Sequence, residues 1–513
     1  MIETIRKTLL ATATLSLAVP GIAQIPPASP TAAQLPNQPA EKPAPAPATG
    51  LAQAEAARLI DAWLDSVQVY DRLPSLTAAI VQGDRIVWAN GYGAIDARRS
   101  VPATPSTIYS ICSISKLFTA VALMREWEAG KVRLDAPVSS YLPWATLKPN
   151  GEDSVPMTVR GVLTHSAGLP RESAHSYWTG PDFPFPTTAE IEATMAGQDP
   201  LYPASRWFQY SNLGLTLAGA TVAAVSGEDY AAYAQKHVLV PLGLADTRPF
   251  MPMDLYGKRL AVGWGALKRD GTRDLVKPFD TKGIAAAAGY TSTVEDLGKF
   301  AVWQFRLLKS GTPEVLKAST LREMQRVHFT DPDWRVTWGL GFNVARRGER
   351  SYVGHGGDCP GYHSTLMLRP DSETAVTAMA TGSENPGPLA QQVFALLDKR
   401  QGYAFKDPAP ASGVRLEEFA GRYSAQPWGN EFVILPWAGG LVSLDLPSRT
   451  PADDLEFMKP KGDDVFRPVR ASGGEMGDDI RFVRDAGGRV NGITRFGNLS
   501  KRVGEVAAAR MRD

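Results

Sequence analysis

Apolar residues recur at helical spacing near residue 60. Leu59, Ile60, Trp63, Leu64 and Val67 fall on one face of a helix, which predicts a helix over residues 51–67. Two short apolar runs follow, at residues 78–81 and 86–88, on either side of a Gly-Asp pair, so they predict a β-hairpin. The start of the chain's main body therefore combines helix and sheet.

Further short apolar runs occur late in this body and predict consecutive antiparallel strands. They cover residues 338–344, 351–353, 362–368 and 374–380, and a helical pattern follows at residues 389–398. The region between the early hairpin and these strands is mainly helical. We therefore expect an α+β domain over residues 51–402, in which an antiparallel sheet built from both ends of the domain packs beside a helical layer.

The pattern changes after a break that contains Pro408, Pro410 and Gly413. Short alternating runs are separated by the turn pairs 439–440 and 487–488, which is typical of an antiparallel barrel or sandwich. The runs are 419–423, 431–435, 441–446, 455–458, 480–484 and 489–496. We expect a linker over residues 403–411 and a small all-β, barrel-like domain over residues 412–513.

The first 50 residues have the composition of a targeting segment and a spacer. Arg6 and Lys7 precede an apolar stretch at residues 8–19 that is too short to span a bilayer, and small residues follow it. This order predicts a cleavable signal peptide over residues 1–23, with a periplasmic or secreted mature chain that has no membrane span. Residues 24–50 are rich in proline and alanine and predict an extended spacer.

Composition excludes several classes of binding partner. The 513 residues include 54 Lys and Arg against 53 Asp and Glu, so no charge excess attracts nucleic acid or an anionic membrane. Two cysteines are too few for a disulfide framework or a four-ligand zinc ribbon, and the histidines do not pair with acids at metal-ligand spacing. We expect no metal, no cofactor and no nucleic acid, and the neutrality suits a small uncharged or zwitterionic substrate. The oligomeric state is not predicted.

Candidate chemistry begins at the segment Ser113-Ile114-Ser115-Lys116, directly before an apolar helical run at residues 117–124. Residues three apart share a helix face, so the Lys116 amine is expected beside the Ser113 hydroxyl. A serine at a helix start also gains free N–H groups and the positive end of the helix dipole. The pair suits a nucleophile with a neighbouring base, although such a short motif also occurs by chance in a solvated first turn.

Two more motifs follow in order, Tyr210-Ser211-Asn212 and His355-Gly356-Gly357. The series Ser-x-x-Lys, Tyr-x-Asn and His-x-Gly resembles the signature of the serine β-lactamase and penicillin-binding-protein superfamily. Within it, the chain resembles the class C β-lactamase, D-alanyl carboxypeptidase, D-aminopeptidase and esterase branch. The resemblance spans about residues 51–402 and implies the β-lactamase/transpeptidase-like fold. Residues 412–513 resemble the small barrel appended to some family peptidases, with a first strand at 416–423.

The resemblance also implies roles for the motif residues. Ser113 would be the nucleophile that forms an acyl-enzyme, and Lys116 and Tyr210 would share the proton, with a neighbouring cation lowering the pKa of Tyr210. Asn212 would hold the acyl-side amide of the substrate and steady Lys116. His355 stands where β-lactamases often have lysine; it would donate to Tyr210 and carry part of a charge near neutral pH.

The third motif carries two further expectations. The backbone N–H groups of Ser113 and Asp358 would form the oxyanion hole. Because strand side chains alternate, Gly356 and Asp358 face the same way, where relatives often place hydroxyls for a substrate carboxylate. One hydroxyl is missing here and the other position is an acid, which favours substrates with a free amine or a neutral ester. Alternatively, Asp358 turns to solvent or pairs with an arginine.

The resemblance also bears on the two cysteines. Some class A carbapenem-hydrolysing enzymes have a disulfide at the same relative positions, which implies a bridge between Cys112 and Cys359, with two free thiols as the alternative.

Three functions remain open. The first is a peptidase or amidase acting on small peptides, including D-residue peptides; the second is a carboxylesterase or class C-like β-lactamase; the third is a penicillin-binding or sensor module without turnover. Trp178 and Trp207 are candidates to line a pocket.

Overall fold

The computed structural model describes residues 50–148, 155–405, 415–470, 473–507 and 511–512. The predicted signal peptide at residues 1–23, the spacer up to residue 49 and residues 406–411 of the predicted linker lie outside the described residues. Within the described ranges, no helix is long and apolar enough to cross a membrane.

The first domain is built on an antiparallel sheet of eight strands, in the order β2-β1-β10-β9-β8-β7-β6-β5. Its strands are β1 (Ser75–Gln82), β2 (Arg85–Gly93), β5 (Phe329–Thr330), β6 (Thr337–Trp338), β7 (Asn343–Arg347), β8 (Arg350–Cys359), β9 (Tyr362–Arg369) and β10 (Thr374–Thr381). β1 pairs with β10, so the two ends of the domain meet within the sheet, next to its β2 edge. The expectation of a sheet assembled from both ends of the domain is confirmed.

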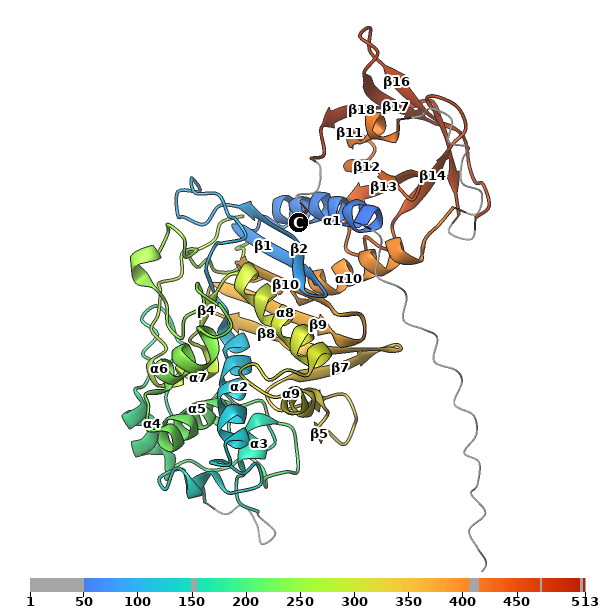
Figure 1. Ribbon diagram of the computed structural model, residues 1–513. Helices are drawn as coiled ribbons and strands as arrows, with labels where there is room; N and C mark the ends of the chain where they lie inside the picture. Colours follow the sequence, from blue (N-terminus) through green and yellow to red (C-terminus); the bar gives the residue numbers. More distant parts are fainter. Residues whose placement is uncertain (1–49, 149–154, 406–414, 471–472, 508–510, 513) are drawn as a thin grey trace, which may run out of the picture. The chain divides into compact units, whose positions relative to one another are not determined.

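Helices cover both faces of this sheet (Figure 1). α1 (Gly50–Tyr70) and α10 (Gly387–Gly402) cover one face, and α8 (Val294–Ser310) covers the other, with α2 (Ser115–Glu128) and α5 (Asn212–Ser226) beyond it. Neighbouring residues of β1 enter different cores, since Ala79 and Val81 pack with α8 while Ala78 and Ile80 pack with α1. The shorter helices are α3 (Val159–Leu163), α4 (Thr188–Met195), α6 (Tyr230–Ala234), α7 (Ala285–Ala288) and α9 (Ala318–Gln325).

Several predicted strands are longer in the structure, such as β8, which spans Arg350–Cys359 where 351–353 was expected, and two others are divided or shifted. The single strand expected at 338–344 is divided into β6 and β7, because the chain bends at Gly341 (φ 81°) and passes close to α9 at Gly339. A Cβ on Gly339 would lie 2.2 Å from the carbonyl oxygen of Met324. The strand expected at 416–423 begins only at residue 421, because Leu416–Phe419 forms a 3-10 turn.

The second domain is a closed eight-stranded barrel, as expected. Its strands are β11 (Gly421–Ser424), β12 (Glu431–Trp437), β13 (Gly440–Leu446), β14 (Glu456–Pro460), β15 (Val465–Val469), β16 (Ile480–Arg484), β17 (Val490–Arg495) and β18 (Asn498–Gly504). β15 and β18 were not predicted, because Pro468 interrupts the first and the second is mostly polar. Gly439 and Gly488 have positive φ at the two predicted turns.

The outer surface of the barrel packs against α1. Val433, Leu435 and Trp437 belong to the same buried cluster as the apolar face of α1, and Trp63 donates its indole N–H to the carbonyl of Ser448 at 3.0 Å. The alternate residues of β12 belong to the barrel's own interior cluster, with Ile434 buried in it. β12 therefore divides its side chains between the domain contact and the barrel interior.

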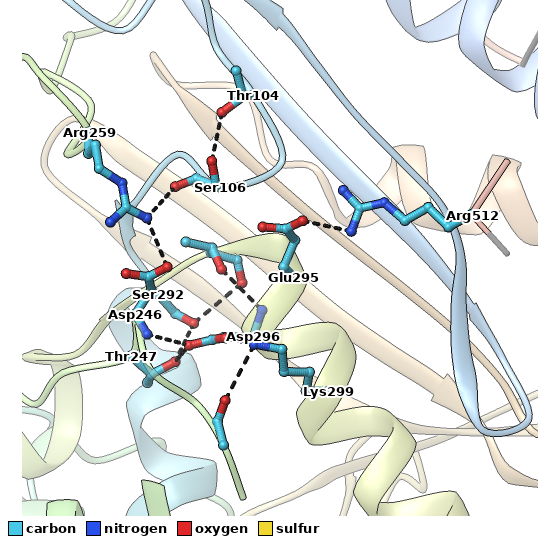
Figure 2. Close-up of polar contacts among 12 residues, drawn as sticks. Thr104, Ser106, Asp246, Thr247, Arg259, Ser292, Glu295, Asp296, Lys299 and Arg512 are labelled. Atoms are coloured by element: carbon cyan, nitrogen blue, oxygen red, sulfur yellow. Dashed lines mark hydrogen bonds and ion pairs between the residues drawn. The ribbon is translucent and has the colours of Figure 1, made fainter. Parts of the chain in front are cut away.

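The start of α8 is fixed by a polar network (Figure 2). Asp296 is almost fully buried; its carboxylate accepts the backbone N–H of Asp246 at 2.8 Å and the hydroxyl of Thr247 at 3.0 Å, and it pairs with Lys299 at 2.8 Å. Near the end of the chain, Arg512 pairs with Glu295 of the same helix turn at 2.6 Å. These contacts fix the position of the segment after residue 288, which borders the candidate active site.

Candidate active site

Ser113 lies in a short 3-10 helix (Cys112–Ile114) that leads directly into α2. Cys112 has φ 50°, a left-handed conformation that non-glycine residues rarely adopt, so the chain turns sharply just before the serine. Lys116 is fully buried, and its Nζ lies 2.9 Å from the Ser113 Oγ. The expected proximity of these two side chains is confirmed.

The amine of Lys116 has two other close neighbours. Nζ donates to Asn212 Oδ1 at 2.7 Å and to the carbonyl of Ala287 at 2.8 Å. Burial lowers the pKa of Lys116 well below its usual value, against the opposing effect of Glu172. A neutral amine would use its two N–H groups on Asn212 and Ala287, and its lone pair would then face the Ser113 hydroxyl.

Tyr210 lies beside Ser113 and Lys116, and its ring centre is 4.9 Å from Lys116 Nζ. His165 stacks on the ring at 4.3 Å and accepts the backbone N–H of Ser211 at 3.0 Å, which fixes the tyrosine's segment. The expectation of a lowered pKa for Tyr210 is wrong. Burial raises it, and this effect exceeds the lowering by the Ser113 hydrogen bond and the Arg171 cation. In this structure Tyr210 is a phenol.

His355 joins the site from β8, with its ring centre 6.0 Å from that of Tyr210. Its Nδ1–H donates to the carbonyl of Gly356 at 2.5 Å, while Nε2 has no hydrogen-bond partner among the described residues. Burial and the nearby Lys116 lower the pKa of His355 to about 3. The ring is therefore neutral near pH 7, and the expected partial charge and donation to Tyr210 are corrected.

β8 passes very close to the chain that carries Ser113. A Cβ on Gly357 would lie 2.1 Å from the carbonyl oxygen of Ile111, so only glycine fits there. Cys112 and Cys359 form a disulfide with their Cα atoms 5.7 Å apart, which confirms the implied bridge. The structure thus holds the Asp358 segment beside Ser113, where an oxyanion hole formed by their N–H groups would require it.

The side chains of β8 alternate as expected. His355, Gly357 and Cys359 are buried, whereas Gly356 and Asp358 are exposed. The Asp358 carboxylate is 83% exposed and lies 3.5 Å from Nδ1 of His363 on β9. The side chain therefore turns to solvent, as the alternative interpretation expected, and its neighbour is a histidine and not an arginine.

Two residues of the site were not predicted from the sequence, Arg171 and Glu172. Glu172 Oε1 accepts the Asn212 side-chain N–H at 2.6 Å and the Trp178 indole N–H at 2.9 Å. The Arg171 guanidinium lies 5.0 Å from the ring centre of Tyr210 and is 57% exposed. Both lie between the first and second of the three motifs, and no pattern in the sequence marks them.

The two candidate tryptophans have different surroundings. Trp178 contacts Glu172 and packs edge-on against Phe185, with ring centres 4.9 Å apart, so it borders the polar group behind Asn212. Trp207 is 38% exposed, with the Arg206 guanidinium 5.8 Å from its ring centre. Of the two, only Trp178 contacts a residue of the site.

The fold and the paired Ser113 and Lys116 define a serine hydrolase with the β-lactamase/transpeptidase-like architecture. The chain belongs to the β-lactamase family, whose model matches residues 57–399. It is similar to human beta-lactamase-like 1, with 27% identity over 393 residues, 72% of this chain and 74% of the relative. Protein flp of Staphylococcus aureus (strain MW2) is 23% identical over 312 residues, which are 60% of this chain and 59% of flp.

Solved structures share this fold at low sequence identity. The octameric penicillin-binding protein homologue from Pyrococcus abyssi has a TM-score of 0.58 and 23% identity, and covers 86% of this chain and 99% of its own. The class C β-lactamase from Rhodobacter sphaeroides has a TM-score of 0.55 and 22% identity over 66% of this chain and 98% of its own. The Pyrococcus abyssi structure matches a larger part of the chain than the family model does.

Proposed function

We propose that the protein is an exported amidase or peptidase that cleaves small peptides, including D-residue peptides, through an acyl-enzyme on Ser113. The observation that carries this proposal is the 2.9 Å contact between the Ser113 hydroxyl and the buried amine of Lys116. Burial favours the neutral amine, and a neutral amine next to a hydroxyl is a general base next to its nucleophile.

Acylation follows from this pair. Lys116 takes the Ser113 proton as Oγ attacks the substrate carbonyl, and the backbone N–H groups of Ser113 and Asp358 stabilise the oxyanion. The scissile C–N bond breaks as the phenol of Tyr210 gives its proton to the leaving amine. The ammonium of Lys116 then returns a proton to Tyr210. This order uses the protonation states that burial favours, a neutral Lys116 and a protonated Tyr210.

Deacylation uses the same general base, with water as the nucleophile in place of the Ser113 hydroxyl. Lys116 takes a proton from the attacking water, the ester bond to Ser113 breaks, and the proton returns to Oγ. Asn212 keeps the Lys116 amine in place during both halves, because its Oδ1 accepts from Nζ and its N–H is fixed on Glu172. His355 remains neutral and shapes the site beside Tyr210 without supplying charge.

One exposed acidic group on the strand beside the site supports a substrate with a free amine. The exposed carboxylate of Asp358 lies on the same face of β8 as Gly356, which offers no hydroxyl to a substrate carboxylate. A D-stereospecific amidohydrolase from Streptomyces sp. has a TM-score of 0.51 to this chain at 22% identity. SurE crystallised with D-Leu has the same TM-score and identity. Both are consistent with an amide or peptide substrate of this kind.

One experiment separates this proposal from its alternatives. A fluorophosphonate probe is applied to the wild type and to Ser113→Ala, and labelling is competed with a D-amino acid amide, a p-nitrophenyl ester or a chromogenic cephalosporin. We expect labelling of the wild type alone and turnover of the amide. Equal labelling of both proteins would contradict the role of Ser113. Turnover of the ester or the cephalosporin alone would favour the esterase or β-lactamase, and acylation without turnover a sensor.

The role of Asp358 has its own test. Asp358→Ser should reduce the preference for amine-bearing over carboxylate-bearing substrates, because it replaces the acid with a hydroxyl that can donate to a carboxylate. The ratio of kcat/KM for the two substrate types measures this preference. Glu349→Ser, at an exposed acid in the turn between β7 and β8, is the matched control and should leave the ratio unchanged. An unchanged ratio in Asp358→Ser would contradict the proposed preference.

A further inference from the structure

The C-terminal barrel is only partly filled by its own side chains. Phe419, Phe466 and Phe482 pack together in its interior, with ring centres 4.5 to 5.3 Å apart. Beside them lies a cavity of about 400 Å³ that is lined from β12, β13, β14, β16, β17 and β18. A volume of this size is sufficient for a small organic ligand, and eight-stranded barrels can enclose one.

The lining follows the alternation of the strands. Phe432 and Ile434 of β12 and Ser443 and Asp445 of β13 are i, i+2 pairs that point inward, and Asp445 lies opposite Phe432 in the ladder between the two strands. Further apolar walls come from Met458, Ile480 and Ile493. The lining is therefore mixed, and the apolar side chains stand beside the polar side chains of Ser443, Asp445, Asp454, Glu456, Arg495 and Ser500, which suits an amphipathic ligand.

The charges in the cavity are not balanced. Glu456 and Arg495 neutralise each other in a bidentate pair with both distances at 2.7 Å. Asp454 accepts the hydroxyl of Ser448 at 2.6 Å. The Asp445 side chain is exposed and has no hydrogen bond or ion pair within the described parts of the chain, and partial desolvation together with the neighbouring Glu456 raises the pKa of its carboxyl group. A cation placed at Asp445 would offset the repulsion between the Asp445 and Glu456 carboxylates.

A second polar group points to the same space. Ser443 is 8% exposed and lines the cavity, and its hydroxyl has no hydrogen-bond partner among the described residues. Ser443 lies two residues before Asp445 on β13, so one ligand can contact both side chains.

From these observations we infer that the barrel cavity binds a small amphipathic amine. Its apolar body packs on Phe432, Ile434 and Met458, its ammonium group pairs with Asp445, and a polar group beside the ammonium bonds to Ser443. This site is separate from the Ser113 centre and does not depend on the proposed hydrolysis. It makes the barrel a ligand-binding domain attached to the hydrolase.

The test uses the full chain after Ser113 has been blocked with the fluorophosphonate probe, so that the hydrolase site does not contribute. Calorimetry measures binding of 4-phenylbutylamine, the alcohol 4-phenylbutanol and the anion 4-phenylbutanoate. We expect saturable 1:1 binding of the amine, with Kd below about 1 mM, and weaker binding of the alcohol and the anion. No saturable amine binding, or tighter binding of the anion, would overturn the inference.

Variants place the binding in the barrel. Asp445→Asn should weaken amine binding by about tenfold to a hundredfold, because it removes the charge and keeps the shape. Asp463→Asn, at an exposed barrel carboxylate outside the cavity lining, should leave the affinity unchanged. Ser443→Phe should fill the cavity and abolish binding, with a melting curve to verify folding. Equal affinity in Asp445→Asn and Asp463→Asn would overturn the inference even if Ser443→Phe does not fold.

Discussion

Cys112 and Cys359 are 247 residues apart in the sequence, and their disulfide joins the residue before Ser113 to the strand that borders the site. Reduction, or the double substitution Cys112→Ser with Cys359→Ser, should lower the free energy of unfolding by up to about 5 kcal/mol, because such a long loop is then released in the unfolded chain. Guanidinium unfolding of oxidised and reduced protein measures this difference. Equal midpoints would show that the bridge adds no stability.

The same bridge should matter for activity. It fixes Cys112 in its left-handed conformation and holds β8 beside Ser113. We therefore expect the reduced protein to react more slowly with the fluorophosphonate probe at a temperature where it is still folded. Ser113→Ala supplies the background rate, and circular dichroism verifies the fold. Identical labelling rates before and after reduction would show that the site keeps its geometry without the bridge.

Lys116 gives the third prediction. Lys116→Met should lower the rate of probe labelling by about 10²- to 10⁴-fold, the usual contribution of a general base. Burial lowers the pKa of Lys116, so the wild-type rate should rise with pH and reach its plateau well below the ordinary lysine value of 10.5. Lys148→Met, at a surface lysine, is the control and should behave as wild type. A Lys116→Met protein with a normal labelling rate would rule out this base.

Glu172 gives a prediction about positioning. Glu172→Ala removes the acceptor that holds the Asn212 amide, and Asn212 in turn holds Lys116. We expect kcat to fall by about 10- to 100-fold through this indirect loss, by analogy with the outer partners of other catalytic groups. Glu172→Gln keeps an oxygen for Asn212 and should recover most of the rate. If the two variants lost the same activity, the charge of Glu172 and not its hydrogen bond would be responsible.

Contacts of the site between residues close in sequence could be predicted, whereas those between residues distant in sequence could not. The contact between Ser113 and Lys116 follows from helix geometry, and the inward and outward faces of β8 follow from strand alternation, so both were predictable. The pKa directions of Tyr210 and His355 were not, because they depend on burial by residues distant in sequence. Glu172 was missed for the same reason.

Prediction of the barrel from the sequence has the same limit. Turn glycines and alternating runs were sufficient to predict six of its strands, whereas β18 lacks the apolar pattern and is defined only by pairing with β11 and β17. That closure depends on contacts between the first and last strands of the domain, more than 70 residues apart in the sequence. The interior cavity depends on the closure in turn.

His355 gives a prediction about stability. Its folded pKa of about 3 lies below the ordinary value of 6.5, so between these pH values the unfolded chain binds one more proton than the folded chain. The stability from this group is complete above pH 6.5 and is lost as the pH falls toward 3, at about 1.4 kcal/mol per pH unit. His355→Asn should therefore show a shallower loss of stability between pH 6 and pH 4 in urea unfolding. Parallel curves for both proteins would contradict the neutral buried ring.

The two glycines after His355 offer a matched pair of substitutions. A Cβ on Gly357 would meet the Ile111 carbonyl oxygen at 2.1 Å and Ser364 Oγ at 2.2 Å, whereas a Cβ on Gly356 has its nearest neighbour at 3.8 Å. Gly357→Ala should therefore cost about 1 to 3 kcal/mol of stability or more, since backbone must move. It should also slow probe labelling, because β8 would be displaced from Ser113.

Gly356→Ala should leave both quantities close to wild type, since its Cβ enters open space on the exposed face of the strand. Melting temperature and labelling rate, measured side by side, separate the two variants. Equal tolerance of both would mean that the close contact between β8 and Ile111 does not constrain the site. Equal damage would instead mean that the exposed face at Gly356 is occupied during the reaction with the probe.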